Sequence, residues 1–234
     1  MIAVVTSTIK PVVENNPKRS FYTFAERLEQ TKQTLTQLAA CAFTAVYIID
    51  NSPSLNQLEL QQLLIDFPQV QVYHIQEYQF ENKGINELLM LLYLCKHLPA
   101  NQNIFKISGR YYPLAHFKKP NFSDFAVKSY HYHTRTGTIS TRAYWVKDSE
   151  VLNQFLLSCL DEVFTYPKRV TGIRSLYNQF GQVFLNKAIN PINISIEFAA
   201  ANVLKNGNYK ATLVNNIGIE GLVAGADHIE KITE

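Results

Sequence analysis

The sequence predicts an α/β fold with a mostly parallel, Rossmann-like central sheet and helices on both of its faces. Within the first 113 residues, four apolar strand-like segments alternate with three helix-like segments, and this alternation is typical of parallel sheets covered by helices. After Pro113 the pattern changes to a pair of strands followed by helices, which predicts antiparallel additions. A chain of 234 residues fits a single domain of this kind.

The elements of the first half have clear local signatures. Residues 2–9 begin apolar and end polar, and residues 45–49 are continuously apolar, as in strands buried on both faces. Phe24, Leu28 and Leu35 share one helical face, whereas residues 84–97 are apolar nearly all round, which predicts a buried helix. Strands are predicted at residues 2–9, 45–49, 70–75 and from residue 104. Helices are predicted between them, at residues 21–40, 55–67 and 84–97.

The second half is predicted to add an antiparallel hairpin and three helices. Two strands with alternating side chains, expected at residues 125–133 and 138–147, form the hairpin. The further elements are helices at residues 148–161, 175–188 and 194–205, and a last strand at residues 209–214 that leads into a glycine-containing segment, residues 217–221.

Composition excludes several classes of protein. Hydrophobic residues make up 47% and charged residues 18%, as in ordinary globular proteins. The formal charge of +3 is too small to predict a general nucleic-acid binder. The sequence offers no integral membrane segment, and its apolar N-terminal run is too short for a signal peptide. Three widely spaced cysteines indicate buried free thiols, so a cytoplasmic location is expected.

The most informative segment is residues 104–113 (IFKISGRYYP). Because side chains alternate along a strand, Lys106, Ser108 and Arg110 are predicted to share one face. Cations on a central strand are costly unless an anion meets them, and ligands of such sheets bind at the carboxyl ends of the strands. The segment therefore predicts a site for a phosphorylated ligand. The alternative is an edge strand on which Lys106 and Arg110 are simply solvated.

Three short runs resemble GT-A-type nucleotide-sugar glycosyltransferases. They are residues 27–31 (RLEQT), residues 49–52 (IDNS), and residues 106–111 (KISGRY), the last similar to a run in bacterial glycosyltransferase-like proteins of surface-polysaccharide gene clusters. The resemblance implies a GT-A-like domain with a nucleotide-binding half, residues 1–113, and an acceptor-side half, residues 114–234. It also implies transfer of a sugar from a nucleotide sugar to a glycan or lipid-linked acceptor in polysaccharide or lipopolysaccharide assembly, which is compatible with peripheral membrane association.

The fourth strand departs from that family pattern. It normally delivers an Asp-x-Asp motif that holds a divalent metal on the donor, and here the place is taken by residues 106–111. Lys106 and Arg110 could stabilise the charge of the leaving diphosphate without a required metal. Tyr111 and Tyr112 could offer a stacking face or a hydroxyl group to the sugar, and Ser108 and Gly109 complete the segment. Loss of the acidic pair is equally compatible with loss of activity.

Other strand ends supply further candidates for the donor site. Asp50 and Asn51 follow a buried strand, where they could accept bonds from ribose or base, or could merely form a turn and cap the next helix. Thr6 ends the first strand and is a candidate for the same pocket. Arg142 could contact an anion or form an ion pair. The absence of a Gly-x-Gly-x-x-Gly or Walker loop argues against dehydrogenases and P-loop enzymes.

An inverting transferase also needs a base, commonly a carboxylate, for the acceptor hydroxyl. Asp161, Glu162, Glu197 and Glu220 are the candidates in the second half. Glu220 is preferred because neighbouring glycines permit close approach to a ligand. The alternative for each is a surface or helix-capping acid.

Two further groups of side chains could belong to a site. His131 and His133 lack a recognisable third ligand, so no metal site is predicted. Lys168, Arg169 and Arg174 could close over the diphosphate or be a solvated basic loop. The leading hypothesis is thus a glycosyltransferase. The alternative is a non-catalytic nucleotide- or glycan-binding module on the same scaffold, and another Rossmann-like nucleotide enzyme is disfavoured by the missing glycine motif.

Overall fold

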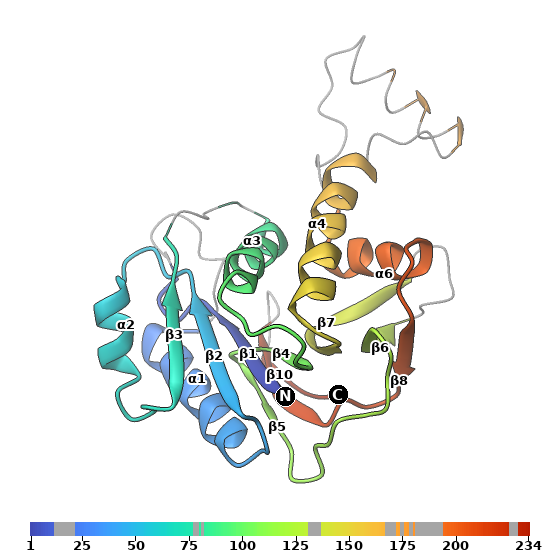
Figure 1. The fold of residues 1–234 in the computed structure, drawn as a ribbon. Coiled ribbons are helices and arrows are strands. Elements are labelled where there is room, and N and C mark those ends of the chain that lie inside the picture. Colours follow the sequence, from blue (N-terminus) through green and yellow to red (C-terminus); the bar gives the residue numbers. More distant parts are fainter. Residues whose placement is uncertain are drawn as a thin grey trace.

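The computed structural model contains two sheets with helices packed around the larger one (Figure 1). It describes residues 1–11, 22–76, 80, 82–130, 137–166, 172–173, 176–177, 180, 194–224 and 229–234. The larger sheet has seven strands in the order β3-β2-β1-β4-β7-β6-β8, and the smaller has three in the order β10-β9-β5.

The first four strands of the larger sheet are parallel. They are β1 (Ile2–Ser7), β2 (Ala45–Asp50), β3 (Val70–His74) and β4 (Ile104–Ser108). In their register Ser7 pairs with Asp50, and Thr6 pairs with Ser108. The carboxyl ends of these strands therefore meet at one edge, which is the edge where ligands of such sheets bind.

The other three strands extend the sheet beyond β4. β7 (Thr138–Val146) pairs antiparallel with β4 and with β6 (Phe125–Tyr130), and β8 (Ala211–Val214) pairs parallel with β6. Four of the six neighbouring pairs are parallel. The predicted class, α/β with a mostly parallel sheet and antiparallel additions, is confirmed.

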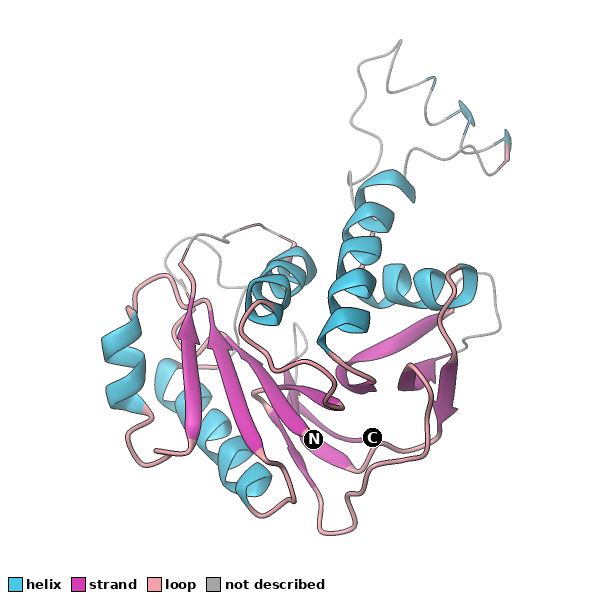
Figure 2. Ribbon diagram, viewed as in Figure 1, coloured by secondary structure: helices cyan, strands magenta, loops and turns pink. Residues whose placement is uncertain are grey.

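Helices cover both faces of the larger sheet (Figure 2). α1 (Phe24–Ala39) and α2 (Gln57–Leu63) pack on one face with β-strand residues such as Val5 and Phe105. α3 (Lys83–Cys95), α4 (Ser149–Thr165) and α6 (Ile196–Asn206) pack on the other face. Each face thus buries its own apolar core, as the continuously apolar strands predict.

The smaller sheet differs from the sequence prediction. Its strands are β5 (Tyr111–Pro113), β9 (Ile219–Ala224) and β10 (Ile229–Thr233). The chain does not continue as one strand after residue 108, because Gly109 and Arg110 form a turn. Gly221 allows β9 to approach, since a Cβ atom there would lie 2.4 Å from the Arg110 carbonyl oxygen.

Most remaining elements match their predictions within a few residues. Only Leu176, Tyr177 and Phe180 of the helix expected at residues 175–188 are described, and all three are helical. His131, His133, Lys168, Arg169 and Arg174 lie outside the described residues. Among the helices that are described, none is both long enough and apolar enough to cross a membrane.

Candidate functional site

The carboxyl edge of β1, β2 and β4 brings together several of the predicted site residues. The Gly109 N–H donates to the Thr6 carbonyl oxygen at 2.8 Å, and the Asn51 N–H donates to the Ser7 carbonyl oxygen at 3.3 Å. Thr6 and Asn51 are buried, and Ser108 is partly exposed beside Thr6. The ends of three strands therefore form one continuous edge.

Asp50 and Asn51 hold the loops at this edge in place. The fully buried Asp50 carboxylate accepts the Ile9 N–H and the Ser52 N–H, each at 2.8 Å. The Asn51 Oδ1 atom accepts the Thr8 hydroxyl at 2.5 Å. Because both Asp50 oxygens already bind backbone donors, the contacts favour the turn-forming alternative for Asp50.

Lys106 lies on the α3 side of the sheet, with its side chain fully buried. Its Nζ atom forms an ion pair with Glu87 of α3, and it donates to the Thr141 carbonyl oxygen at 2.5 Å and to the Ser108 hydroxyl at 3.2 Å. The Tyr144 ring centroid lies 5.6 Å away. These partners match the three donors of an ammonium group, and a buried charge requires such compensation.

Arg110 lies on the opposite side, beside α1. Its guanidinium carbon is 6.0 Å from the Tyr111 ring centroid, and its charge acts on Tyr22 and Arg27. The prediction that Lys106 and Arg110 share a face is therefore wrong. Side chains alternate only within a strand, and β4 ends at Ser108 before Arg110 is reached.

Arg27, which begins the run at residues 27–31, is a site residue that the sequence did not predict to bind a ligand. Its Nη1 atom donates to the Thr8 carbonyl oxygen at 2.8 Å, which places the guanidinium against the loop after β1. Burial and the positive charge of Arg110 lower the pKa of Arg27 to about 10, while Asp50 acts in the opposite direction. Two neighbouring guanidinium groups repel each other, and an anion bound between them would relieve that repulsion.

Tyr111 lies near both Arg110 and Arg142. The guanidinium carbon of Arg142 is 5.8 Å from the centroid of the buried Tyr111 ring, a distance similar to that of Arg110. Arg142 forms an ion pair with the buried Glu234 carboxylate, which also accepts the Ser140 hydroxyl at 2.6 Å. The charge of Arg142 is thus balanced within the fold, as in the ion-pair alternative.

Tyr112 and Glu220 face each other in the smaller sheet. The Tyr112 hydroxyl donates to Glu220 Oε1 at 2.6 Å, and Lys231 Nζ lies 2.8 Å from the same oxygen. Both contacts, that of Lys231 first, lower the pKa of Glu220. A lowered pKa makes a carboxylate a weaker base, so these contacts favour a structural role for Glu220.

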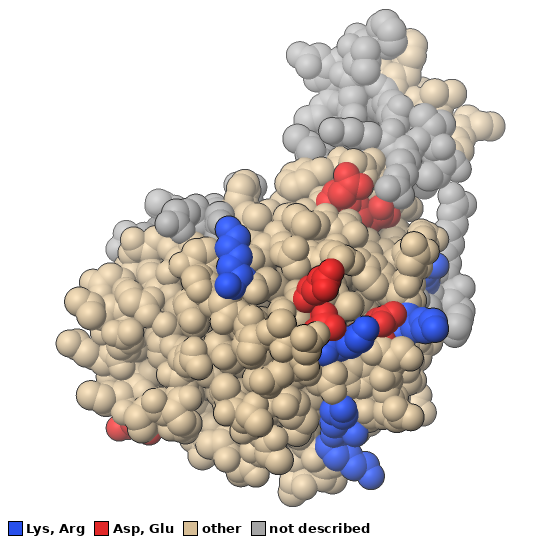
Figure 3. All heavy atoms as spheres, viewed as in Figure 1, with Lys and Arg blue, Asp and Glu red and all other residues tan. Residues whose placement is uncertain are grey.

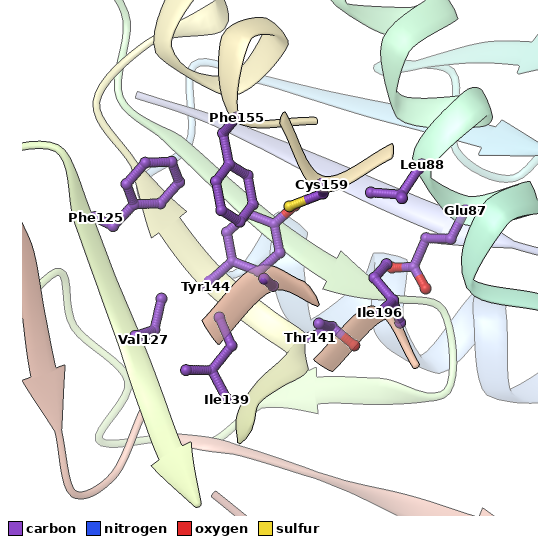
Figure 4. A pocket seen from close by; sticks show the side chains of 11 residues that line it. Glu87, Leu88, Phe125, Val127, Ile139, Thr141, Tyr144, Phe155, Cys159 and Ile196 are labelled. Atoms are coloured by element: carbon purple, nitrogen blue, oxygen red, sulfur yellow. The ribbon is translucent and has the colours of Figure 1, made fainter. Parts of the chain in front are cut away.

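A cavity lies on the other face, between the sheet and helices α3, α4 and α6 (Figure 4). Tyr144, Phe155 and Ile196 are among its lining residues, and although Glu87 and Thr141 also line it, the surface that it exposes is apolar. It has room for about one water molecule, so it is a small void in the core and not a space for a substrate. The Glu87 side chain, which Lys106 holds in position, is 22% exposed.

Among the residues that the structure describes, no group of three or more His, Cys, Asp or Glu side chains is placed to hold a metal ion. Glu197, at the start of α6, accepts from the Thr141 hydroxyl at 3.5 Å. Glu162 is buried and accepts from the Asn202 amide at 3.1 Å, and Asp161 is exposed on α4.

Comparison with known proteins identifies the fold. No protein-family model and no curated protein matches the chain. A nucleoside-diphosphate-sugar pyrophosphorylase from Vibrio cholerae is similar over 94% of this chain and 94% of its own, with 11% identity and a TM-score of 0.53. The chain shares that fold.

Two proteins from Streptococcus pneumoniae give lower scores. A CTP:phosphocholine cytidylyltransferase has 12% identity and a TM-score of 0.43, over 94% of this chain and 92% of its own. A glycosyltransferase in its apo form has 9% identity and a TM-score of 0.44, over 90% of this chain and 44% of its own.

Proposed function

We propose that this protein is a glycosyltransferase that moves a sugar from a nucleotide-sugar donor to a glycan or lipid-linked acceptor in polysaccharide or lipopolysaccharide assembly. The observation that carries the proposal is the pair Arg27 and Arg110 at the carboxyl edge of β1 and β4. That edge is where ligands of such sheets bind. Neighbouring guanidinium groups suit an anion with several oxygens, such as a diphosphate.

In this proposal the arginines replace the metal of Asp-x-Asp enzymes. When the bond between the sugar and the diphosphate breaks, negative charge grows on the leaving oxygens, and Arg27 and Arg110 stabilise it. Thr6, Ser108 and Gly109 form the floor of the donor site, with Asn51 beside them. A divalent metal is then not required for binding or transfer.

Glu87 has a structural role in this proposal. It lies on the α3 side of the sheet, whereas Arg27 and Arg110 lie on the α1 side, and it is paired with the buried Lys106. Through Lys106, whose Nζ atom also binds Ser108, it helps to fix the end of β4 below the donor site.

A second candidate function is a non-catalytic nucleotide-binding module. The Asp50 carboxylate and the Lys106 ammonium group bind other groups of the protein. Because neither side chain then takes part in sugar transfer, this arrangement favours the binding module.

Release of nucleoside diphosphate from a panel of nucleotide sugars, with and without EDTA, tests the proposal. The wild type is expected to release diphosphate in EDTA, and Arg110→Ala is expected to lower the rate at least about a hundredfold. Lys32→Ala, on the exposed side of α1, is the matched control and should change nothing. Binding without any release or transfer would favour the binding module, and loss of activity in EDTA would contradict a metal-independent site.

A further inference from the structure

A group of basic and aromatic side chains is joined by contacts between cations and rings. Its members, here called the basic–aromatic cluster, are Arg110, Tyr111, Arg142, Tyr130 and Lys128. The guanidinium carbons of Arg110 and Arg142 lie 6.0 and 5.8 Å from the Tyr111 ring centroid. The Tyr130 centroid lies 5.9 Å from the same atom of Arg142 and 5.6 Å from Lys128 Nζ. These are distances of cation–π contacts, so the cluster is continuous from Arg110 to Lys128.

The cluster begins at the proposed donor site and follows the same edge of the larger sheet. Arg110 comes directly after β4, Arg142 lies on β7, and Lys128 and Tyr130 lie on β6. Because β7 is antiparallel to both neighbours, the carboxyl end of β4 lies beside the first half of β7 and the second half of β6. β7 separates β4 from β6 (Figure 1), which puts Lys128 roughly 10 Å along the edge from β4.

The centre of the cluster is held in place by Glu234. The buried Glu234 carboxylate accepts from the Tyr130 hydroxyl, from Arg142 and, at 2.6 Å, from the Ser140 hydroxyl. Arg142 Nη1 also donates to the Tyr130 hydroxyl oxygen at 2.7 Å. The Arg142 charge and the Tyr130 ring are therefore fixed by the fold before any ligand binds, which lowers the cost of binding one.

The two ends of the cluster carry positive charge that the fold does not balance. Within the described part of the chain, neither Arg110 nor Lys128 forms an ion pair. Both side chains are partly exposed, so a ligand can reach them. On the face of the molecule shown in Figure 3, basic and acidic side chains are interspersed, with no broad basic patch. An excess of cations thus distinguishes the cluster, and an anionic ligand would relieve their mutual repulsion.

We infer that the acceptor of the proposed transferase carries an anionic group, a phosphate or a carboxylate, and that Lys128 binds it. The inference rests on the proposed function, in which the donor diphosphate occupies Arg27 and Arg110. Lys128 is then the cation of the cluster that remains for a second anion. The half-buried Tyr130 ring beside it offers a stacking face to a sugar. The phosphate of a lipid-linked acceptor and the carboxylate of an acidic glycan share this chemistry.

The binding of matched charged and neutral probes to the whole chain tests the inference without requiring turnover. Isothermal titration compares decyl phosphate with decyl glucoside, and a hyaluronan tetrasaccharide with chitotetraose, in an excess of inorganic pyrophosphate that fills the donor site. At least one anionic probe should bind about tenfold or more tightly than its neutral counterpart. The pair that shows this difference identifies the source of the anion, and salt should weaken the binding.

Substitutions then locate the bound anion. Lys128→Gln should lower the affinity for the anionic probe about tenfold, whereas Lys128→Arg, which keeps the charge, should retain it. Lys147→Gln is the matched control and should leave the affinity unchanged. Lys147 is exposed and follows β7 at the opposite edge of the sheet. Circular dichroism of each variant checks that the fold is intact.

Several results would overturn the inference. Equal binding of charged and neutral probes would remove the role of the anion, as would failure of both anionic probes to bind. Equal loss in Lys128→Gln and Lys147→Gln would mean that general surface charge attracts the probe. Complete displacement by pyrophosphate would place the probe in the donor site. If the probe depends on Lys128 but no nucleoside diphosphate binds, the anion site stands and the proposed function alone is contradicted.

Discussion

Replacing Lys106 with methionine removes a buried charge while nearly keeping the volume of the side chain. The change leaves Glu87 without its ion-pair partner and leaves the Thr141 carbonyl oxygen and the Ser108 hydroxyl without the ammonium donor. Breaking a buried ion pair from one side costs about 3–5 kcal/mol. Because Glu87 is 22% exposed and can be partly hydrated, we expect a loss near 3 kcal/mol.

Urea unfolding measures this loss directly, and thermal unfolding should show a decrease in Tm of roughly 6–12 °C for a chain of this size. Lys106→Met/Glu87→Leu removes both charges and should be less destabilised than Lys106→Met alone, because no unpaired charge remains. A loss below about 1 kcal/mol for Lys106→Met would refute the structural role of the pair. A small loss of stability together with a lower nucleotide affinity would be the clearest refutation, since Lys106 would then be a ligand of the phosphates.

Three further predictions concern other parts of the fold and site. Gly221→Ala should cost about 2–3 kcal/mol in urea unfolding, because its Cβ atom would lie 2.4 Å from the Arg110 carbonyl oxygen. Lys231 helps to hold the pKa of Glu220 below its ordinary value. Glu220 therefore stabilises the fold above that ordinary pKa of about 4.3, an effect that is lost as the pH falls through the lowered value, and Glu220→Gln should reduce the loss of stability on acidification. Glu87→Gln should cost about 3 kcal/mol in urea unfolding, because it leaves the buried Lys106 charge without its counter-ion, while nucleotide binding is retained.

Each of these predictions has a clear counter-result. Gly172→Ala is the control for the glycine, since among the described residues no atom lies within 4 Å of a Cβ atom at that position, and an equal loss there would contradict the packing argument. An acid unfolding profile that Glu220→Gln leaves unchanged would show that its contacts do not persist in solution. An unchanged free energy of unfolding in the Glu87→Gln protein would contradict the structural role of its ion pair with Lys106.

The alternation of apolar segments was sufficient to predict the larger sheet, because parallel strands buried on both faces leave continuous apolar runs such as residues 45–49. The smaller sheet was missed because β5 and β9 are short and lie far apart in sequence. Their pairing depends on the Gly109 turn and on the close approach at Gly221. A local sequence pattern predicts neither the turn nor the close approach.

The site was predicted in part. The strand-end residues meet at one edge because the register of parallel strands requires it, whereas Arg110 lies on the α1 side because the strand stops before it. Arg27 begins the run at residues 27–31 that carries part of the resemblance, but nothing in its local pattern shows that its side chain reaches the loop after β1. A usable signal existed for Glu87, the one acidic residue in the largely apolar α3, since a lone acid in a buried helix requires a cation such as Lys106.

The binding of nucleoside diphosphates and nucleotide sugars in metal-free buffer, followed by thermal shift, tests the central claim most directly. A ligand at a hundred times its dissociation constant should stabilise the protein by about 2.7 kcal/mol. We expect this stabilisation in EDTA for the wild type and for Lys32→Ala, and its loss in Arg27→Ala and Arg110→Ala. Stabilisation that needs Mg²⁺ or Mn²⁺, or that survives both arginine substitutions, would contradict an arginine-based donor site.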